Sequence, residues 1–374
     1  MKKNGKVIAI LEIASASTGG MLIGQNKNGK PQIISLSRVP VNFLFDVNFD
    51  AFWRCTLASL KKVIKILLKN YPSGPDACLC VFISPWFLSQ TKIINVRREK
   101  KFKVTRDFFE NLMKSEEESF KSQEATQLKG EPGFIEHEII KTELNGYYTR
   151  SPLGKIAKTI RLHIYMSLGI GSIKTKIEEE VLENFGDIPL SFKTFPFIAF
   201  QILNSTINNQ EGLILVDIGG EITDISLIRN NCLEETISFP RGKNFLLRRI
   251  ASEFKTFSQE ADSILQTYLK GHSLKGDSEK ISKIIEEVKK DWGNFFEIAV
   301  KNIAENPPTG GPLPQTLFLM GDEVIGGQFI KCAEEERFSQ YTFLGKPFNT
   351  KRLLDEDQLD VFLMLEALFA NKFL

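Results

Sequence analysis

The sequence contains few of the residues that build metal and redox sites. Its 374 residues include only three histidines and five cysteines. The histidines are isolated, and no second pair of cysteines or histidines accompanies Cys78 and Cys80, which argues against a zinc site. These two cysteines lie two apart in a strand-like run, so we expect a buried pair of free thiols.

Long apolar runs are also lacking. The opening residues Met1 to Lys6 lead directly into an alternating strand, without the apolar stretch of a signal peptide. No run in the sequence is long enough to span a bilayer. We therefore expect a cytoplasmic protein with reduced cysteines.

Neither sign of charge is in excess. The chain has 48 basic and 46 acidic residues, and this formal charge of +2 supplies no global attraction to nucleic acid or anionic membrane. Its 42% hydrophobic and 25% charged content is typical of a soluble globular protein and excludes a disordered chain. A chain of this length is expected to form two or more folded units.

What the sequence does contain is one pattern in two copies. In residues 213–228 an apolar run ends at Asp217, two glycines turn the chain, and an alternating strand returns. Residues 7–23 repeat the pattern, with Glu12 at the corresponding place. Each copy alone also fits an ordinary β-turn. A facing pair could hold the phosphates of one nucleotide, because glycine lets backbone N–H groups approach an anion and a carboxylate can hold hydrated Mg²⁺.

The residues around the first copy predict half of a duplicated architecture. Residues 6–41 favour a three-stranded meander. Apolar residues at three- and four-residue steps predict a helix from Phe52 to Leu68, and a buried strand is expected from Ala77 to Ser84. The predicted order is therefore three strands, a helix and a fourth strand.

Residues 84–172 interrupt this pattern and have no phosphate turn of their own, so we expect a small inserted α+β domain. Thr105 is the predicted N-cap of a helix. The polar residues Ser115–Glu118, and then Gln123–Pro132, are expected to form a loop or a frayed helix end. Strands are predicted at Glu136–Glu143 and Lys158–Leu168.

The second copy is followed by a similar succession. The predicted elements are a strand at Leu233–Phe239, a helix from Arg241 to about Phe257, a long amphipathic helix at Lys280–Ala304, a strand at Thr316–Met320 and a helix at Gln328–Glu334. Gly321 lies between the end of the last strand and the start of the last helix. The junction of a strand end with a helix N-terminus is a common place for a nucleotide to bind.

With these motifs the chain resembles the actin-like ATPase superfamily, in particular the bacterial branch of the cell-division protein FtsA and the pilus-assembly protein PilM. The resemblance covers essentially the whole chain. It implies an α/β fold, namely a duplicated, two-lobed actin/RNase H-like fold with a small inserted α+β domain. It implies a first lobe at 1–83 with 173–212, an inserted SHS2-like domain at 84–172, and a second lobe at 213–374 that includes a helical subdomain at 239–307.

The same resemblance implies a site for ATP or ADP with Mg²⁺. Asp217 and Glu12 would hold the metal through water. The residues that would bind the nucleotide are Ser15, Ser17, Thr18, Gly219, Gly220, Thr223, Gly242, Gly321 and Asp322. No catalytic residue is assigned.

Several positions depart from the family pattern. The first motif has Glu12 and Ala14 where aspartate and glycine are usual. Phe195 stands where many relatives carry a glutamate that positions the attacking water, and a phenyl ring cannot do so. Leu265 replaces the usual lysine of a helix near the base. These departures imply weak or degenerate ATP binding and at most weak ATPase activity.

The first functional hypothesis is a cytoplasmic scaffold that links assembly of a cell-division or type IV pilus machine to the membrane. Its partners would be division or pilus assembly proteins, and self-association into dimers or filaments is left open. The residues from Asp357 to Phe369 predict a last core helix whose acidic content is poorly suited to anionic lipid, so membrane recruitment is expected to depend on a partner.

Two other hypotheses belong to different classes. A small-molecule kinase or an active ATPase of the same superfamily would need an acceptor site, and no such constellation is visible. Nucleic-acid binding would use the basic run from Arg97 to Lys103. A solvated, charged strand edge explains that run better, and contact with a protein partner or with acidic lipid is also open there.

Overall fold

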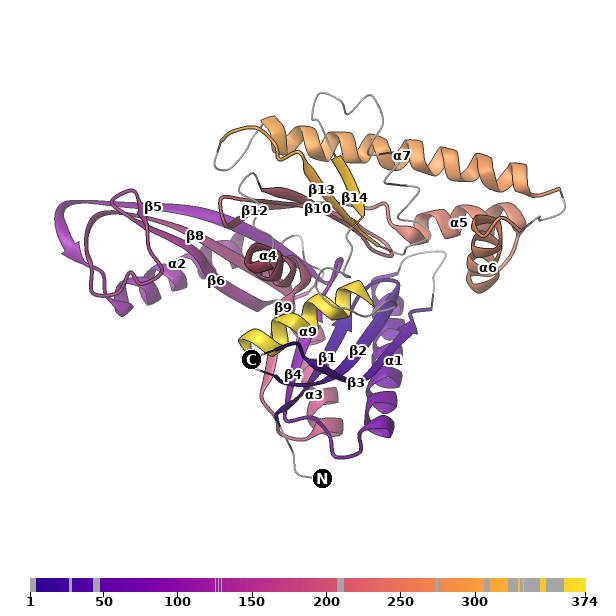
Figure 1. Ribbon diagram of the computed structural model, residues 1–374, viewed down its shortest axis with the longest axis horizontal. Coiled ribbons are helices and arrows are strands. Elements are labelled where there is room, and N and C mark those ends of the chain that lie inside the picture. Colours follow the sequence, from indigo (N-terminus) through magenta and orange to yellow (C-terminus); the bar gives the residue numbers. More distant parts are fainter. Residues whose placement is uncertain are drawn as a thin grey trace.

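The computed structural model describes residues 5–26, 29–42, 48–124, 126, 128, 130–206, 212–272, 276–305, 310–321, 329, 332, 344–347 and 360–374. Within these residues the strands form three sheets. Two of the sheets belong to the body of the molecule, and the third projects to one side (Figure 1).

The first sheet is built mainly from the opening residues and is called the N-terminal sheet. Its strands are β1 (Val7–Ile13), β2 (Ser17–Gly24), β3 (Gln32–Pro40), β4 (Ala77–Phe82) and β9 (Leu190–Thr194). Their order is β3-β2-β1-β4-β9, with β1 antiparallel to β2 and parallel to β4. One face packs on α1 (Phe49–Asn70) and α3 (Gly171–Phe185).

The second sheet, called the C-terminal sheet, repeats this topology. Its strands are β10 (Leu213–Ile218), β11 (Thr223–Arg229), β12 (Cys232–Phe239), β13 (Thr316–Met320) and β14 (Leu344–Pro347). The order β12-β11-β10-β13-β14 has the same sequence of antiparallel and parallel pairings as the N-terminal sheet. The duplication predicted from the two hairpin patterns is thus confirmed at the level of the sheets.

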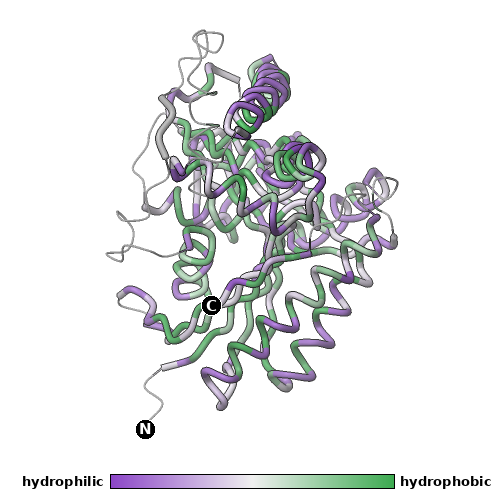
Figure 2. Tube along the Cα trace, turned by 90° about the vertical axis from the view of Figure 1, so that its right-hand side faces the viewer, coloured by the Kyte–Doolittle hydropathy of each residue, from purple (hydrophilic) through white to green (hydrophobic). Residues whose placement is uncertain are grey.

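Three helices from the residues after β12 pack together, and the longest of them covers the outer face of the C-terminal sheet. They are α5 (Lys243–Phe254), α6 (Ser258–Leu269) and α7 (Ser278–Glu305). The apolar stripe of α7 packs on this sheet and includes the buried side chains of Trp292 and Phe296. The long amphipathic helix predicted from the stripe is confirmed, and Figure 2 shows helices along which hydrophobic and hydrophilic residues alternate.

Two helices lie between the two sheets. They are α4 (Phe195–Thr206) and α9 (Val361–Phe373), which contact each other. One buried cluster combines Ile10 of β1, Leu215 of β10 and Leu363 of α9, so both sheets share this core. The last helix of the chain therefore packs against the first strands, and the C-terminus lies near them in Figure 1.

The third sheet comes from the chain between β4 and β9. Its elements are β5 (Phe87–Lys103), α2 (Arg106–Glu124), β6 (Pro132–Leu144), β7 (Tyr147–Tyr148) and β8 (Ile156–Ile170). The strands are antiparallel in the order β5-β8-β6-β7. An inserted unit of mixed helix and strand was predicted for this part of the chain.

One prediction within this unit is wrong. The polar stretch from Ser115 to Glu118 continues α2 instead of forming a loop or a frayed end. Glu116 pairs with Lys92 of β5 at 2.5 Å and Glu117 with His137 of β6 at 2.7 Å, so the acidic side chains fasten the helix to the sheet.

The chain after β13 is described only in part. Of the helix predicted at Gln328–Glu334, only Phe329 and Cys332 lie within the described residues, and both are helical. The start of the helix predicted from Asp357 also lies outside them, and α9 runs from Val361 to Phe373. Among the helices that are described, none combines the length and apolar character needed to cross a bilayer.

Candidate functional site

The turns of the two hairpins meet between the N-terminal and C-terminal sheets. The backbone N–H of Glu221 donates a hydrogen bond of 3.0 Å to Oγ of Ser15. A Cβ atom placed on Gly220 would lie 2.6 Å from the backbone nitrogen of Ala16. The structure therefore brings the two predicted turns together, but it brings them into direct contact.

The second turn is closed from behind by the start of α5. The backbone N–H groups of Lys243 and Asn244 donate to the carbonyl oxygens of Gly219 and Gly220, at 3.0 and 2.8 Å. A Cβ atom on Gly242 would lie 2.5 Å from both of those oxygens. Only glycine fits at this position, and the helix N-terminus is occupied by the protein's own carbonyl groups.

Glu12, Gly19 and Arg38 form a row across three adjacent strands. Glu12 pairs with Gly19 between β1 and β2, and Gly19 pairs with Arg38 between β2 and β3. Because Gly19 has no side chain, Arg38 reaches over it; a Cβ atom there would lie 3.2 Å from Nη2 of Arg38. The guanidinium donates to Oε1 and Oε2 of Glu12 at 2.5 and 2.8 Å, which is a bidentate ion pair.

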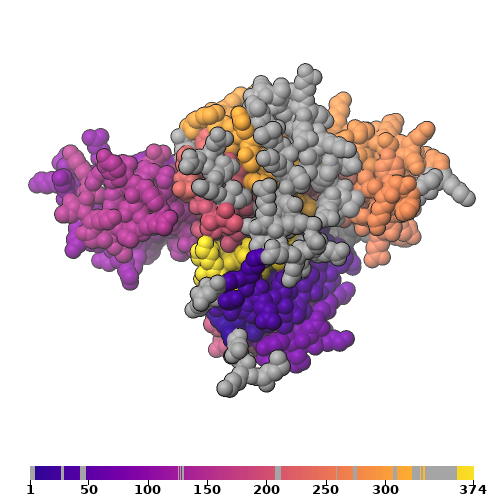
Figure 3. Space-filling model, in the orientation of Figure 1, coloured from indigo at the N-terminus to yellow at the C-terminus, as the bar shows by residue number. Residues whose placement is uncertain are grey.

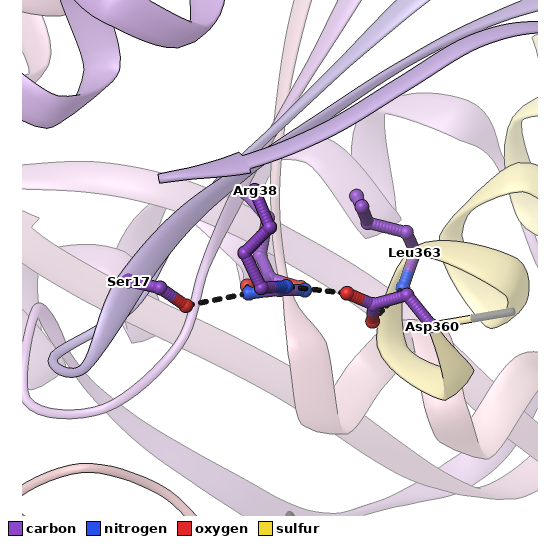
Figure 4. Close-up of polar contacts among 5 residues, drawn as sticks. Ser17, Arg38, Asp360 and Leu363 are labelled. Atoms are coloured by element: carbon purple, nitrogen blue, oxygen red, sulfur yellow. Dashed lines mark hydrogen bonds and ion pairs between the residues drawn. The ribbon is translucent and has the colours of Figure 1, made fainter. Parts of the chain in front are cut away.

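The same guanidinium joins two more groups (Figure 4). Nη1 of Arg38 donates to Oγ of Ser17 at 2.8 Å. Nε of Arg38 donates to Asp360, whose side chain also caps α9 by accepting from the backbone N–H of Leu363 at 3.3 Å. Arg38 thus connects the first hairpin to the start of the last helix.

The carboxyl groups around this pair are buried. Burial raises the pKa of Glu12, although the charge of Arg38 opposes the shift. Asp217 is the cross-strand partner of Asp224, and its Oδ1 has no hydrogen-bond partner. Burial, then Asp224 and then Glu12 raise the pKa of Asp217 well above its usual value.

A further buried carboxyl comes from α9. Glu366 is fully buried, and neither of its side-chain oxygens has a hydrogen-bond partner. Burial raises its pKa well above the usual value, and the charge of Glu12 adds to the shift. At both Asp217 and Glu366, burial therefore disfavours the charged form of the carboxyl.

The other predicted nucleotide contacts lie near the hairpins. Oγ1 of Thr223 donates to the carbonyl oxygen of Arg241 at 2.5 Å and accepts from Nε1 of Trp292 at 3.1 Å, so both functions of this hydroxyl are used within the core. Thr18 is buried and its hydroxyl has no partner. Gly321 follows β13 and lies against Ile218, whereas Asp322 falls outside the described residues.

The residues of this site do not fit a magnesium–nucleotide complex in the arrangement that the structure has. Both carboxylate oxygens of Glu12 accept hydrogen bonds from Arg38, and Oγ of Ser15 accepts one from the backbone N–H of Glu221. The contact between Gly220 and Ala16 leaves no room for a phosphate between the turns. In the described part of the chain no group of three or more acidic, histidine or cysteine side chains is placed to hold a metal ion.

Sequence reasoning missed Arg38, Asp360 and Glu366. A signal for the first was present, because a glutamate in an otherwise apolar strand requires a cation or a proton when buried. Strand pairing places Arg38 in line with that glutamate. Asp360 had no such signal, since it lies 322 residues from Arg38 along the chain.

Comparisons with known proteins bear on the fold. No protein-family model matches the sequence, and no curated protein matches it. The solved PilM–PilN type IV pilus biogenesis complex is similar at a TM-score of 0.64 and 14% identity, over 96% of this chain and 95% of that one. The chain thus has the actin-like ATPase fold in a form similar to that of PilM.

Two further solved structures are more distant. One is a protein of actin-like ATPase fold and unknown function from Bacteroides thetaiotaomicron, with a TM-score of 0.45 and 10% identity over 95% of this chain and 98% of that one. The other is the ethanolamine utilization protein EutJ from Carboxydothermus hydrogenoformans, with a TM-score of 0.44 and 13% identity over 90% and 82%.

Proposed function

We propose that this chain is a PilM-like or FtsA-like scaffold that links assembly of a type IV pilus or cell-division machine to the membrane through a partner. The third sheet with α2 would be its SHS2-like domain. In this role the two halves supply a fixed shape for partners, and ATP with Mg²⁺ binds weakly or not at all. A pilus role is favoured over division because the most similar of the reported structures is PilM in a pilus complex.

One observation supports the scaffold role above the others: contacts within the protein already engage residues that are predicted to hold the nucleotide and its metal. Arg38 pairs with both oxygens of Glu12, which is one of the predicted metal ligands, and Gly220 lies in direct contact with Ala16. A scaffold that is held closed by its own side chains needs no nucleotide to keep its shape. An active enzyme would have to break both contacts in every cycle.

A pocket at the edge of the third sheet is the proposed place for the partner. It has a volume of about 330 Å³ and is lined by residues 87–91 of β5 and 234–236 of β12, together with Glu124 and Ser238. Each of the two strands is the outer strand of its sheet. An extended partner segment could add to such an edge through backbone hydrogen bonds.

The charge of the pocket indicates the kind of segment. The lining includes three glutamates and no basic residue. Glu234 is neutralised by Arg229 at 2.9 Å, whereas burial raises the pKa of the half-buried Glu235. The lining therefore carries little unpaired charge, and an extended partner segment that offers hydrogen-bond donors would suit it.

The partner assignment is tested by coprecipitating the tagged full chain with the PilN-like or division proteins encoded near its gene. Binding of a PilN-like protein that is lost with Glu235→Lys and kept with Glu183→Lys supports the proposal. Glu183 is an exposed residue of α3 and serves as the matched control. Failure of every pilus and division candidate to bind would contradict it.

The nucleotide part is tested separately by calorimetry with ATP and Mg²⁺. The expected dissociation constant is about 1 mM or weaker, which corresponds to about −4 kcal/mol. Any residual binding should disappear in Asp217→Ala if this residue faces the nucleotide. Micromolar ATP binding with turnover, or phosphorylation of a sugar panel, would favour the alternative of an active ATPase or a small-molecule kinase.

A further inference from the structure

The outer end of the third sheet forms a distinct surface, called here the tip surface and defined as residues 97–104 and 145–158. The end of β5 meets the start of β8, where Lys103 pairs with Ile156. The backbone N–H of Gly154 donates to the carbonyl oxygen of Val104 at 2.9 Å. Two segments that are about 40 residues apart in sequence therefore make one continuous surface.

The tip surface is strongly basic. Its two segments contain eight basic residues and one acidic residue, Glu99. All eight basic side chains are exposed: Arg97, Arg98, Lys100, Lys101, Lys103, Arg150, Lys155 and Lys158. The whole chain has a net charge of only +2, so the remainder of the protein is net negative. The positive charge of the molecule is therefore concentrated at the tip surface.

Part of this positive charge lies at an irregularity in β5. Between Arg97 and Phe102 the pairing with β8 shifts register, since these residues pair with Thr159 and Ala157. The basic residues between them therefore bulge out of the ladder. The guanidinium carbon of Arg98 lies 4.3 Å from the centre of the Phe102 ring, which supports the bulge.

Large apolar side chains are exposed on the same surface. Tyr147 is 79% exposed, Tyr148 54%, Leu153 51% and Ile156 63%. They account for four of the eleven exposed large hydrophobic residues among those that the structure describes. A cluster of this kind at a strongly basic end indicates a binding surface, whereas single exposed apolar residues need no explanation.

We infer that the tip surface docks directly on an anionic phospholipid bilayer. The basic side chains contact the lipid phosphates, while the tyrosines lie at the level of the headgroups and Leu153 and Ile156 enter the acyl boundary. The contact is peripheral and weak by itself, so it acts together with attachment through a protein partner. It goes beyond the proposed function and does not depend on it.

The arrangement favours lipid over nucleic acid. Tyrosines could stack on bases, but exposed Leu153 and Ile156 would gain nothing from a phosphate backbone. Figures 1 and 3 show the third sheet as a projection whose outer end lies far from the two larger sheets. A bilayer can therefore meet the tip surface without reaching the hairpins or the helices of the C-terminal sheet.

The test is flotation of the full chain with vesicles of phosphatidylethanolamine, with and without phosphatidylglycerol. Binding is expected only with phosphatidylglycerol and should fall with salt. The double variant Lys155→Glu/Lys158→Glu should bind about 25-fold more weakly or worse, because each basic residue near an anionic surface contributes about a factor of five. Leu153→Asn/Ile156→Thr should weaken binding while leaving its salt dependence in place.

The matched control is Lys65→Glu/Lys69→Glu, which reverses the same number of exposed lysines on α1 and should bind like the parent. A second readout is Tyr147→Trp, whose emission should shift to shorter wavelength with anionic vesicles only. Absence of flotation, or equal flotation with neutral vesicles, overturns the inference. So does tight binding of duplex DNA that the charge variant abolishes and the apolar variant retains.

Discussion

Gly220 of the second hairpin lies directly against Ala16 of the first, and a Cβ atom on Gly220 would come within 2.6 Å of the Ala16 nitrogen and 2.8 Å of its Cβ. One of these atoms is backbone, so it cannot move aside as a flexible side chain would. The contact joins the N-terminal and C-terminal sheets where the turns of the two hairpins meet.

Gly220→Ala is therefore expected to push the turns apart. The free energy of unfolding should fall by about 1–3 kcal/mol, as for other overpacked positions. Urea unfolding followed by circular dichroism measures the loss. Gly24→Ala is the control, because a Cβ there meets nothing closer than 3.6 Å. Equal losses for both variants would contradict the close contact.

Removal of Arg38 should destabilise the protein strongly. Arg38→Met leaves the buried Glu12 without a partner, and breaking a buried pair in this way costs about 3–5 kcal/mol. Arg249→Met removes the exposed pair with Glu287 and should cost at most about 1 kcal/mol. Chemical unfolding of both variants makes the comparison.

A double variant separates the charge of Glu12 from the packing of Arg38. Glu12→Gln/Arg38→Met should lose less stability than Arg38→Met alone, because no carboxylate is then left buried. If the double variant is no more stable than the single one, the unpaired charge of Glu12 does not explain the stability lost in Arg38→Met.

Glu136 should make stability depend on pH. Its Oε1 accepts from the backbone N–H of Thr194 at 2.8 Å, and burial raises its pKa to about 7 while Lys193 opposes the shift. Between pH 4.5 and about 7 the folded protein holds a proton that the unfolded chain releases, so stability falls as pH rises through this window. The change should reach at most about 3 kcal/mol.

Thermal unfolding across that pH range tests the assignment. Glu136→Gln should remove most of the pH dependence in the window. Glu138→Gln is the control, since Glu138 also pairs with Lys193 but is 43% exposed. A pH dependence that survives in Glu136→Gln would assign the proton to another group.

Thr223 should prove to be a residue of the core. Thr223→Val leaves the carbonyl oxygen of Arg241 and the indole N–H of Trp292 without a partner, which costs about 1–3 kcal/mol. Thr267→Val on the exposed side of α6 should change stability little. The measurement is the midpoint of thermal unfolding, and equal midpoints for the two variants would contradict this role.

Local patterns were sufficient to predict the two hairpins and the duplicated order of the sheets. In residues 213–228 an apolar run, two glycines and an alternating strand form a self-contained signal, and the register of β10 with β11 follows it. The helix α7 was also readable, because its apolar stripe extends over many turns.

The remaining features depend on contacts between distant parts of the chain. The helix α4 has few polar residues in its first two turns to reveal its periodicity, since it is buried between the sheets, and the strand β9 has only five residues. The pairing of Arg38 with Asp360 joins residues 322 apart, and no local pattern encodes it. The hairpin patterns therefore located the candidate site. They did not predict that the side chain of Arg38 lies in it.

The placement of α9 has a consequence for how the protein is made. The helix packs on β1, β2 and α4, so the cover of the opening strands on that face is incomplete until residues 361–373 have left the ribosome. Chains of this size fold through intermediates during synthesis. We therefore expect the nascent N-terminal half to expose hydrophobic surface until that point. A chaperone that shields this surface should raise the yield of soluble protein.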